Sequence, residues 1–180
     1  AIVMLGSGND TVEEYIRTHP ECKIGLVKIH LYRPFKADRI LAALPKSVKR
    51  ICVMDKVRDI TGVREPLFLD VAGALQNKRQ VEIIGGRYGI GSKDFAPQHV
   101  EAIAKNLVSA HPKDGFTVGI VNPETALEVG APKDYLPSST RQCLFWGLGA
   151  DGTVGANKQA IKLIVSNTKL YGQAYFAYDA

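Results

Sequence analysis

A glycine-rich segment, WGLGADGTVGANK at residues 146–158, has the residue types and spacing that point most directly to ligand chemistry. Residues 147–152 read GLGADG and match the GxGxxG pattern of dinucleotide-binding turns, between an expected strand and an expected helix. Backbone amides at the start of a helix attract anions. The segment is therefore a candidate site for an anionic ligand.

The segment does not fit a phosphate-binding P-loop, because Lys158 does not directly follow a glycine and is not directly followed by Ser or Thr. Three other interpretations stay open. A dinucleotide site requires an acidic residue about 20 positions downstream, and Asp179 stands farther away than that. The remaining interpretations are a tight turn without a ligand and a site for another anion.

Two other glycine-rich turns follow expected strands. GGRYGIGSKD at residues 85–94 contains Arg87 and Lys93 and lies where sites form in α/β sheets, but no fixed phosphate-binding pattern fits it. GSGND at residues 6–10 is interpreted as a strand-to-helix turn. Neither turn predicts a particular ligand.

Residues for acid–base, nucleophilic or metal chemistry are not arranged in recognisable patterns. Asp55, Asp59 and Glu65 have no histidine close in sequence, and we expect these carboxylates to be solvated. There is no GxSxG or CxxC motif, and the four histidines never fall at metal-ligand spacing. The three cysteines, Cys22, Cys52 and Cys143, are far apart, which argues against a disulfide framework and favours a reducing compartment. We therefore predict no catalytic residue and no metal ligand in this chain.

The composition is that of a globular protein, with 180 residues, 46% hydrophobic residues and 23% charged residues. Its apolar runs are too short to cross a bilayer, and we expect neither a signal peptide nor membrane association. The net charge is +5, with basic residues gathered at Lys46, Lys49 and Arg50 and then at Lys56, Arg58 and Arg64. No aromatic residues are interleaved with them, so nucleic acid is not expected. A solvated basic face is the favoured interpretation, and attraction to an acidic partner comes second.

Short apolar runs alternate with helical patterns over the first 120 residues. The expected strands lie at 2–5, 24–29, 51–54, 81–84 and 116–120, and the expected helices at 11–18, 37–44, 67–75 and 97–108. Thr11 and Glu14 form a capping box for the first helix, and Gly85-Gly86 is expected to end the fourth strand. Continuous apolar strands separated by helical crossovers predict an α/β fold, with an open, mainly parallel sheet and helices on both faces.

The periodicity fails from residue 121 to 141, where prolines and mixed charges indicate a linker. A strand at 143–146, a helix at 153–165 and a β-prone segment at 171–178 then predict the first βαβ of a second domain. We divide the chain into a domain at 1–122, a linker at 123–141 and the beginning of another domain at 142–180. A lone βαβ unit cannot bury both faces of its sheet, so it should belong to a larger structure.

Seven stretches together resemble the pyruvate:ferredoxin (flavodoxin) oxidoreductases, which are 2-oxoacid:acceptor oxidoreductases. They are VMLGSGNDTVEE near the start, KIHLYRPF at 28–35, EPLFLDVAGAL at 65–75, IIGGRYGIGSKDF at 83–95, FTVGIV at 116–121, CLFWGLGADGTVGANKQAIKLI at 143–164 and GQAYFAYD at 172–179. The likeness covers essentially the whole chain in order, and WGLGADGTVGANK is its most specific part.

This resemblance implies that the chain is a segment of a long multidomain enzyme. Residues 1–122 would be a transketolase C-terminal-like domain used in assembly and dimer contacts, and residues 142–180 the start of a gamma-type domain. The whole enzyme would use thiamine diphosphate with magnesium and 4Fe–4S clusters. It would convert pyruvate to acetyl-CoA and CO2 and reduce ferredoxin or flavodoxin, in the cytoplasm or in an anaerobic organelle such as a hydrogenosome. The segment alone would be inactive.

The resemblance also makes coenzyme A a better candidate than NAD for the glycine-rich segment. The residues expected to contact it are Gly147, Gly149, Gly152, Thr153, Asn157 and Lys158. Two rival hypotheses remain. One is an NAD(P)-dependent dehydrogenase that uses GLGADG, and the other is a free-standing oligomerisation module of the transketolase C-terminal type.

Overall fold

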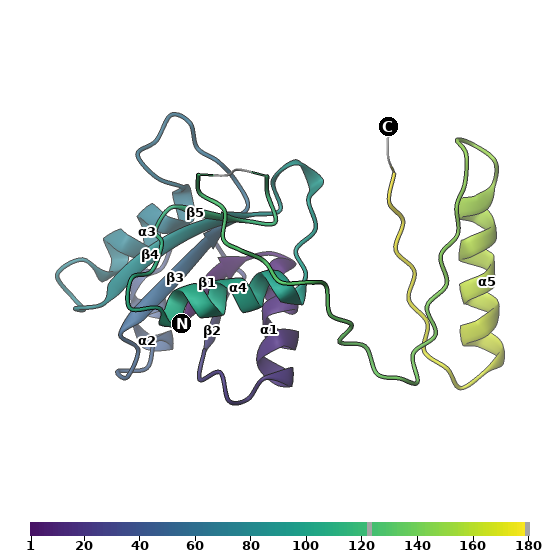
Figure 1. The fold of residues 1–180 in the computed structure, drawn as a ribbon, viewed down its shortest axis with the longest axis horizontal. Coiled ribbons are helices and arrows are strands. Elements are labelled where there is room, and N and C mark those ends of the chain that lie inside the picture. Colours follow the sequence, from purple (N-terminus) through teal and green to yellow (C-terminus); the bar gives the residue numbers. More distant parts are fainter. Residues whose placement is uncertain (122–123, 179–180) are drawn as a thin grey trace. The chain divides into compact units, whose positions relative to one another are not determined.

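A computed structural model describes residues 1–121 and 124–178, and it divides the chain into two compact units, Ala1–Tyr135 and Leu136–Ala180 (Figure 1). The domain boundary that we expected at residues 122 and 123 lies outside the described residues, as does Asp179.

The first unit is built on five parallel strands in the order β2-β1-β3-β4-β5. They are β1 (Ile2–Leu5), β2 (Leu26–Ile29), β3 (Arg50–Asp55), β4 (Glu82–Tyr88) and β5 (Phe116–Val118). Val3 of the second strand in this order pairs with Val27 on one side and Val53 on the other. The open parallel sheet of an α/β fold is thereby confirmed, and it forms because the apolar residues of β1 and β3 are buried on both faces.

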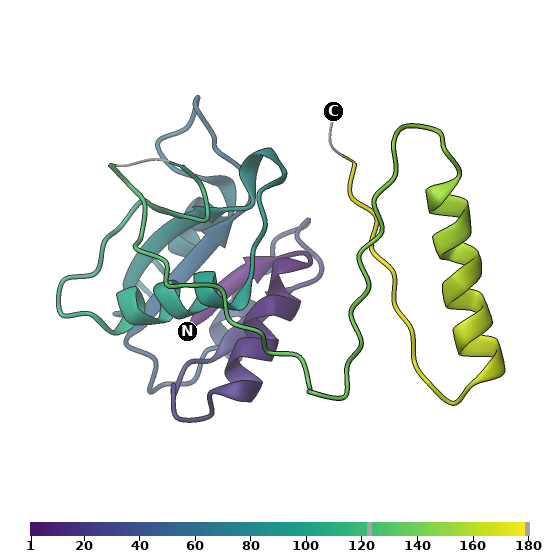
Figure 2. The ribbon, with the colours of Figure 1, turned by 45° about the vertical axis from the view of Figure 1, so that its right-hand side comes forward.

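Four helices cover the two faces of this sheet: α1 (Gly8–Thr18), α2 (Ala37–Ala43), α3 (Pro66–Leu75) and α4 (Pro97–Val108). Figures 1 and 2 show α1 and α4 side by side on one face, where Met4, Met54 and Phe116 belong to their core cluster. On the other face α2 and α3 pack together over Val3 and Val53. Alternate residues of each strand thus serve two separate cores.

One crossover differs in hand from the other three. The crossover through α1 runs from β1 to β2, toward the β2 edge of the sheet, on one face. The crossovers through α2 and α3 run toward the β5 edge on the other face. Reversing both the direction and the face keeps the hand, so these three crossovers have the same hand. α4 leads from β4 to β5 in the direction of α2 and α3 but lies on the face of α1, which gives it the rarer hand. On the α2/α3 face, the described chain therefore places no helix over β5.

The prediction that Gly85 and Gly86 end the fourth strand was wrong. β4 continues through both glycines to Tyr88. A Cβ atom on Gly86 would lie 2.3 Å from Cζ of Phe116, and one on Gly85 would lie 2.7 Å from Cδ2 of Phe68. These glycines make room for a ring on each face of the sheet, since a strand glycine allows another group to approach closely.

The predicted capping box was wrong. α1 begins three residues earlier, at Gly8, so Thr11 lies inside the helix and its hydroxyl donates to the carbonyl oxygen of Phe95 at 3.2 Å. Glu14 pairs instead with Arg17 one turn later, at 2.7 Å. A long-range partner for Thr11 replaces the local one that its spacing suggested.

Part of the expected linker packs on the first unit. Leu127 donates its amide to the carbonyl oxygen of Thr117 at 2.8 Å, and the side chains of Leu127 and Val129 lie against the core. Lys133 forms an ion pair with Glu101 of α4 at 2.8 Å. Backbone pairing with the edge strand β5 gives these residues order that their composition does not indicate.

The second unit contains the expected helix, α5 (Thr153–Asn167), and none of its residues is buried. The segments expected to be strands, 143–146 and 171–178, form no strand in the structure. The physical reason is that a strand requires a hydrogen-bonded neighbour, and these residues have none among those described.

Candidate functional site

The glycine-rich turn before α5 owes its shape to its glycines. Gly149 and Gly152 have φ angles of 59° and 86°, a left-handed conformation that other residues rarely adopt. A Cβ atom on Gly147 would lie 2.8 Å from Cβ of Thr153. All three glycines are thus explained by the turn itself, whether or not it holds a ligand.

Asp151 already supplies an anion to this turn. One of its carboxylate oxygens accepts a hydrogen bond from the amide of Thr153 and the other from the amide of Leu148, both at 2.9 Å. These hydrogen bonds, those of Thr153 first, lower the pKa of Asp151. Sequence reasoning missed this role of Asp151, which stands one residue before Gly152, the N-cap residue of α5. Any phosphate at this helix end would have to use other donors or displace the carboxylate.

The other predicted contact residues lie on the first two turns of α5. Thr153 and Asn157 are half-buried and stand four residues apart, so they share one face of the helix. Lys158 is exposed, and its ammonium group lies 5.6 Å from the ring centroid of Phe176. The structure therefore brings all six predicted residues to one helix end, on an open surface.

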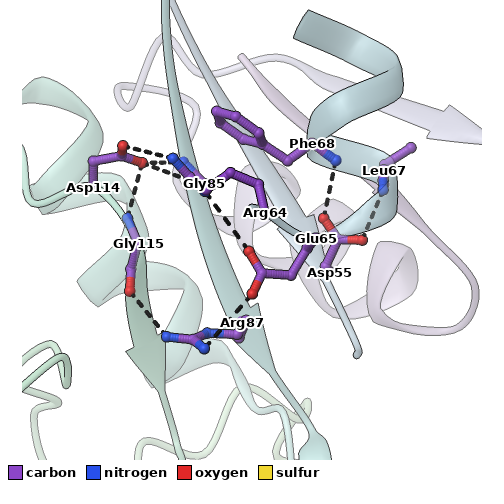
Figure 3. Close-up of polar contacts among 9 residues, drawn as sticks. All are labelled: Asp55, Arg64, Glu65, Leu67, Phe68, Gly85, Arg87, Asp114 and Gly115. Carbon is purple, nitrogen blue, oxygen red and sulfur yellow. Dashed lines mark hydrogen bonds and ion pairs between the residues drawn. The ribbon is translucent and has the colours of Figure 1, made fainter. Parts of the chain in front are cut away.

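A second polar site lies on the α2/α3 face of the sheet (Figure 3). Asp55, at the end of β3, accepts hydrogen bonds from the amides of Leu67 and Phe68 at 3.0 and 3.2 Å, and so caps the first turn of α3. Burial raises the pKa of Asp55, against the lowering effect of these two bonds. Its side chain secures the beginning of a helix whose own N-cap residue, Glu65, makes no capping bond.

Arg64 and Asp114 connect distant parts of the first unit. Two hydrogen bonds, both 2.9 Å, join the guanidinium group to the two carboxylate oxygens, and the guanidinium group also stacks 3.7 Å above the ring centroid of Phe68. Asp114 further accepts the amide hydrogens of Gly85 and Gly115, each at 2.8 Å. These bonds hold Asp114 and Gly115, the residues just before β5, next to Gly85 of β4.

Glu65 completes the cluster. Its carboxylate lies 3.6 Å from Arg87 and 3.9 Å from Arg64, and Arg87 also donates to the carbonyl oxygen of Gly115 at 3.2 Å (Figure 3). The prediction that Asp55 and Glu65 are solvated was wrong, since only 5% and 8% of their surfaces are exposed. The two arginines pair with Glu65 and Asp114, and Asp55 is held by two backbone amides, so every carboxylate of this cluster has a structural partner.

The basic clusters are likewise not uniformly solvated. Arg50 forms an ion pair with Glu82 at 2.6 Å and donates to the carbonyl oxygens of Leu107 and Ser109, and Arg64 pairs with Asp114. Two of the six basic residues that we assigned to an exposed face are therefore structural.

Among residues 1–121 and 124–178, no group of three histidine, cysteine or acidic residues could hold a metal ion. The three cysteines are free, and burial raises the pKa of the Cys52 thiol to about 12. Within the same ranges, no helix has the length and apolar character required to span a bilayer.

The Arg64–Asp114 pair should make the first unit sensitive to acid. Burial acts to raise the pKa of Asp114, but the hydrogen bonds from Arg64 and Gly85 outweigh it and lower the pKa overall. A lowered pKa stabilises the fold above the unfolded-state value, and this stability is lost as the pH falls through the folded-state value. Between about pH 4 and pH 2, the free energy of unfolding should fall less in Asp114→Asn than in the wild type. Denaturant titrations at a series of pH values measure the free energy of unfolding of both proteins. An equal fall of this free energy with pH in the two proteins would contradict the expectation.

Comparison with known proteins bears on both units. The family model described as pyruvate:ferredoxin oxidoreductase core domain II matches residues 1–100. The chain is 46% identical to mitochondrial pyruvate dehydrogenase (NADP+) of Euglena gracilis, with 99% of this chain and 10% of that protein covered. It is 45% identical to pyruvate:ferredoxin oxidoreductase of Moorella thermoacetica and 45% identical to pyruvate-flavodoxin oxidoreductase of Enterobacter agglomerans, with 99% of this chain and 16% of each protein covered. The chain thus spans between a tenth and a sixth of the length of these relatives.

Proposed function

The chain belongs to the family described as pyruvate:ferredoxin oxidoreductase core domain II, and from this premise we propose that it is a structural segment of a longer oxidoreductase. The observation that carries the proposal is the coverage: 99% of the chain aligns with relatives of which it makes up only 10–16%. The paired charges of the first unit support an architectural role.

The parent protein, in this proposal, oxidatively decarboxylates pyruvate to acetyl-CoA and CO2 and passes electrons to ferredoxin or flavodoxin. Thiamine diphosphate with magnesium and 4Fe–4S clusters would supply the carbanion and electron-transfer chemistry. The cysteines of this chain do not fit an iron–sulfur cluster, because they are widely spaced and the thiol of Cys52 is buried with a raised pKa, and no group among the described residues could hold a metal ion. We assign the cofactors to other parts of the parent, which would be a homodimer of the cytoplasm or of a hydrogenosome-like organelle.

Within this segment, we assign assembly and dimer contacts to residues 1–122 and a coenzyme A contact to the glycine-rich turn. Gly147, Gly149 and Gly152 would shape the turn, and Thr153, Asn157 and Lys158 would face the diphosphate. Lys158 carries the positive charge of this set, so its removal should affect coenzyme A most. In the parent, Lys158→Ala should raise the KM for coenzyme A roughly tenfold and leave the KM for pyruvate unchanged. An unchanged KM for coenzyme A would remove Lys158 from the site.

The GxGxxG geometry keeps an NAD(P) site as the second candidate, since Gly149 and Gly152 adopt the left-handed conformation that such turns use. Calorimetric titration of the chain with NADH and with coenzyme A separates the two candidates. A free-standing oligomerisation module would instead give a stable dimer of residues 1–135 in gel filtration, with neither ligand bound.

The purified 180-residue chain should show no turnover of pyruvate with coenzyme A and an electron acceptor, whereas the parent should turn over. The reason is that the described residues contain no group that could hold a metal ion, and the buried carboxylates Asp55 and Glu65 are engaged by backbone amides and by arginines. The assay measures acetyl-CoA formation for both proteins side by side. Turnover by the chain alone would contradict the proposal, and so would an inactive parent with its cofactors bound.

A further inference from the structure

The outward side of α3 is apolar in a place where the described chain leaves it uncovered. The helix reads PLFLDVAGAL, with Asp70 as its single charged residue. Leu69 is 42% exposed, and a Cβ atom added to Gly73 would meet nothing within 4 Å. Helices that are apolar on all sides are ordinarily buried on all sides, so this side of α3 is shaped for contact with another segment.

An unpaired strand edge lies beside this helix. β5 begins opposite Gly86, so the first half of β4 has no strand on that side among the described residues. Between this edge and α3 is a hollow of about 460 Å³. Its lining includes Leu69, Ala72, Gly73 and Gln76 of the helix and Val81 and Ile83 beside it, and we call this set the α3 groove. The crossover of α4 on the opposite face explains why no helix of this unit fills it.

A basic rim adjoins the α3 groove. Arg79 lines both the groove and a second hollow of about 690 Å³, around which stand Lys46, Lys49 and Lys78. Arg79 is held in place because its guanidinium group donates to the carbonyl oxygens of Leu44 and Val48 at 2.7 and 3.2 Å. The three lysines are exposed, and none forms an ion pair within the described parts of the chain. The surface therefore combines an apolar groove with uncompensated positive charge.

Charge decides what can cover this surface. In the second unit, the basic residues Arg141, Lys158, Lys162 and Lys169 outnumber the acidic residues Asp151 and Asp179. A second copy of the chain carries a net charge of +5. Both would place like charges together, which opposes association. A segment with apolar residues on one side and carboxylates on the other could bury its apolar side in the α3 groove and pair its carboxylates with the basic rim.

We propose that the α3 groove and its basic rim form the docking site for an acidic, amphipathic segment of the parent polypeptide outside residues 1–180. This inference rests on the proposed function, because it requires a parent of which the chain is a small part. The occupant lays apolar side chains beside Leu69 and Gly73 and places carboxylates near Lys46, Lys49 and Lys78.

The test compares the parent with the 180-residue chain by lysine acetylation and by zero-length carboxylate–lysine cross-linking, both read by mass spectrometry. In the parent, Lys46, Lys49 and Lys78 should be acetylated at least roughly tenfold more slowly than in the chain. Cross-links should join them to aspartates or glutamates outside residues 1–180. Equal acetylation in the two proteins overturns the proposal, as do cross-links that run only to a separate co-purified protein.

The matched variant is Gly73→Gln, which adds bulk in the groove where the chain alone has open space. The variant chain should keep or raise its Tm, because glutamine favours a helix interior over glycine. The variant parent should lose the slow acetylation of the three lysines, and retained protection would contradict the assigned site. Acetyl-CoA formation by the same preparations tests the proposed function separately, since an active parent with freely acetylated lysines leaves that function standing and removes only the docking site.

Discussion

Replacing Gly86 with alanine should lower the free energy of unfolding of the first unit by about 3 kcal/mol, at the upper end of overpacking effects. The new methyl group would lie 2.3 Å from Cζ of Phe116, whose side chain is fully buried between the sheet and α4. Displacing either the rigid ring of Phe116 or the strand β4 costs free energy, because both are closely packed. The strain is therefore distributed through the core. Urea denaturation followed by circular dichroism measures the change.

Two further variants show whether the ring causes the effect. Gly25→Ala adds the same methyl group where nothing lies within 4 Å, and it should change stability little. Phe116→Leu should offset part of the loss when combined with Gly86→Ala, which would appear as a coupling energy in a double-mutant cycle. A Gly86→Ala protein as stable as the wild type would refute the close approach of ring and strand.

Replacing Asp55 with alanine should cost about 2–3 kcal/mol of unfolding free energy, because it leaves the amides of Leu67 and Phe68 without acceptors at the beginning of α3. Asp55 is 5% exposed, so water cannot readily replace the carboxylate. Thermal unfolding of the variant and the wild type at neutral pH measures this loss.

Asp55→Asn is the matched control, since its amide oxygen can still accept one of the two hydrogen bonds. It should cost less than the alanine variant, and the raised pKa of Asp55 supports this order because burying the negative charge opposes folding. If asparagine proved as costly as alanine, charge would matter more than hydrogen-bond acceptance, contrary to the capping role.

The sheet and its helices were predictable because each depends on a local pattern. Continuous apolar runs such as Ile51–Met54 marked buried strands, and Pro97 with apolar residues at helical spacing marked α4 with the bounds that the structure gives it. The errors arose where a distant partner decides the local structure. The carbonyl oxygen of Phe95 takes the hydroxyl of Thr11, and Phe116 explains Gly86.

The polar cluster was beyond sequence reasoning for the same reason. Arg64 and Asp114 are 50 residues apart, and neither the spacing nor the type of either residue indicates that they meet. Asp55 did carry a usable signal, since it ends an apolar strand and precedes a helix that begins with Pro66. For the glycine-rich turn, the pattern located the six predicted residues at one helix end, but it gave no hint that Asp151 occupies two of the amides.

Native-state hydrogen exchange of the 180-residue chain tests the central claim most directly, namely that a self-supporting sheet is joined to a second unit with no buried residue at 136–178, its described part. Amides of β1, β3 and β4 should exchange at least roughly a thousandfold more slowly than in an unfolded chain. Amides of α5 should exchange within roughly tenfold of the unfolded rate, because a 15-residue helix without buried residues is marginal in water. Protection of α5 equal to that of β3 would contradict the account.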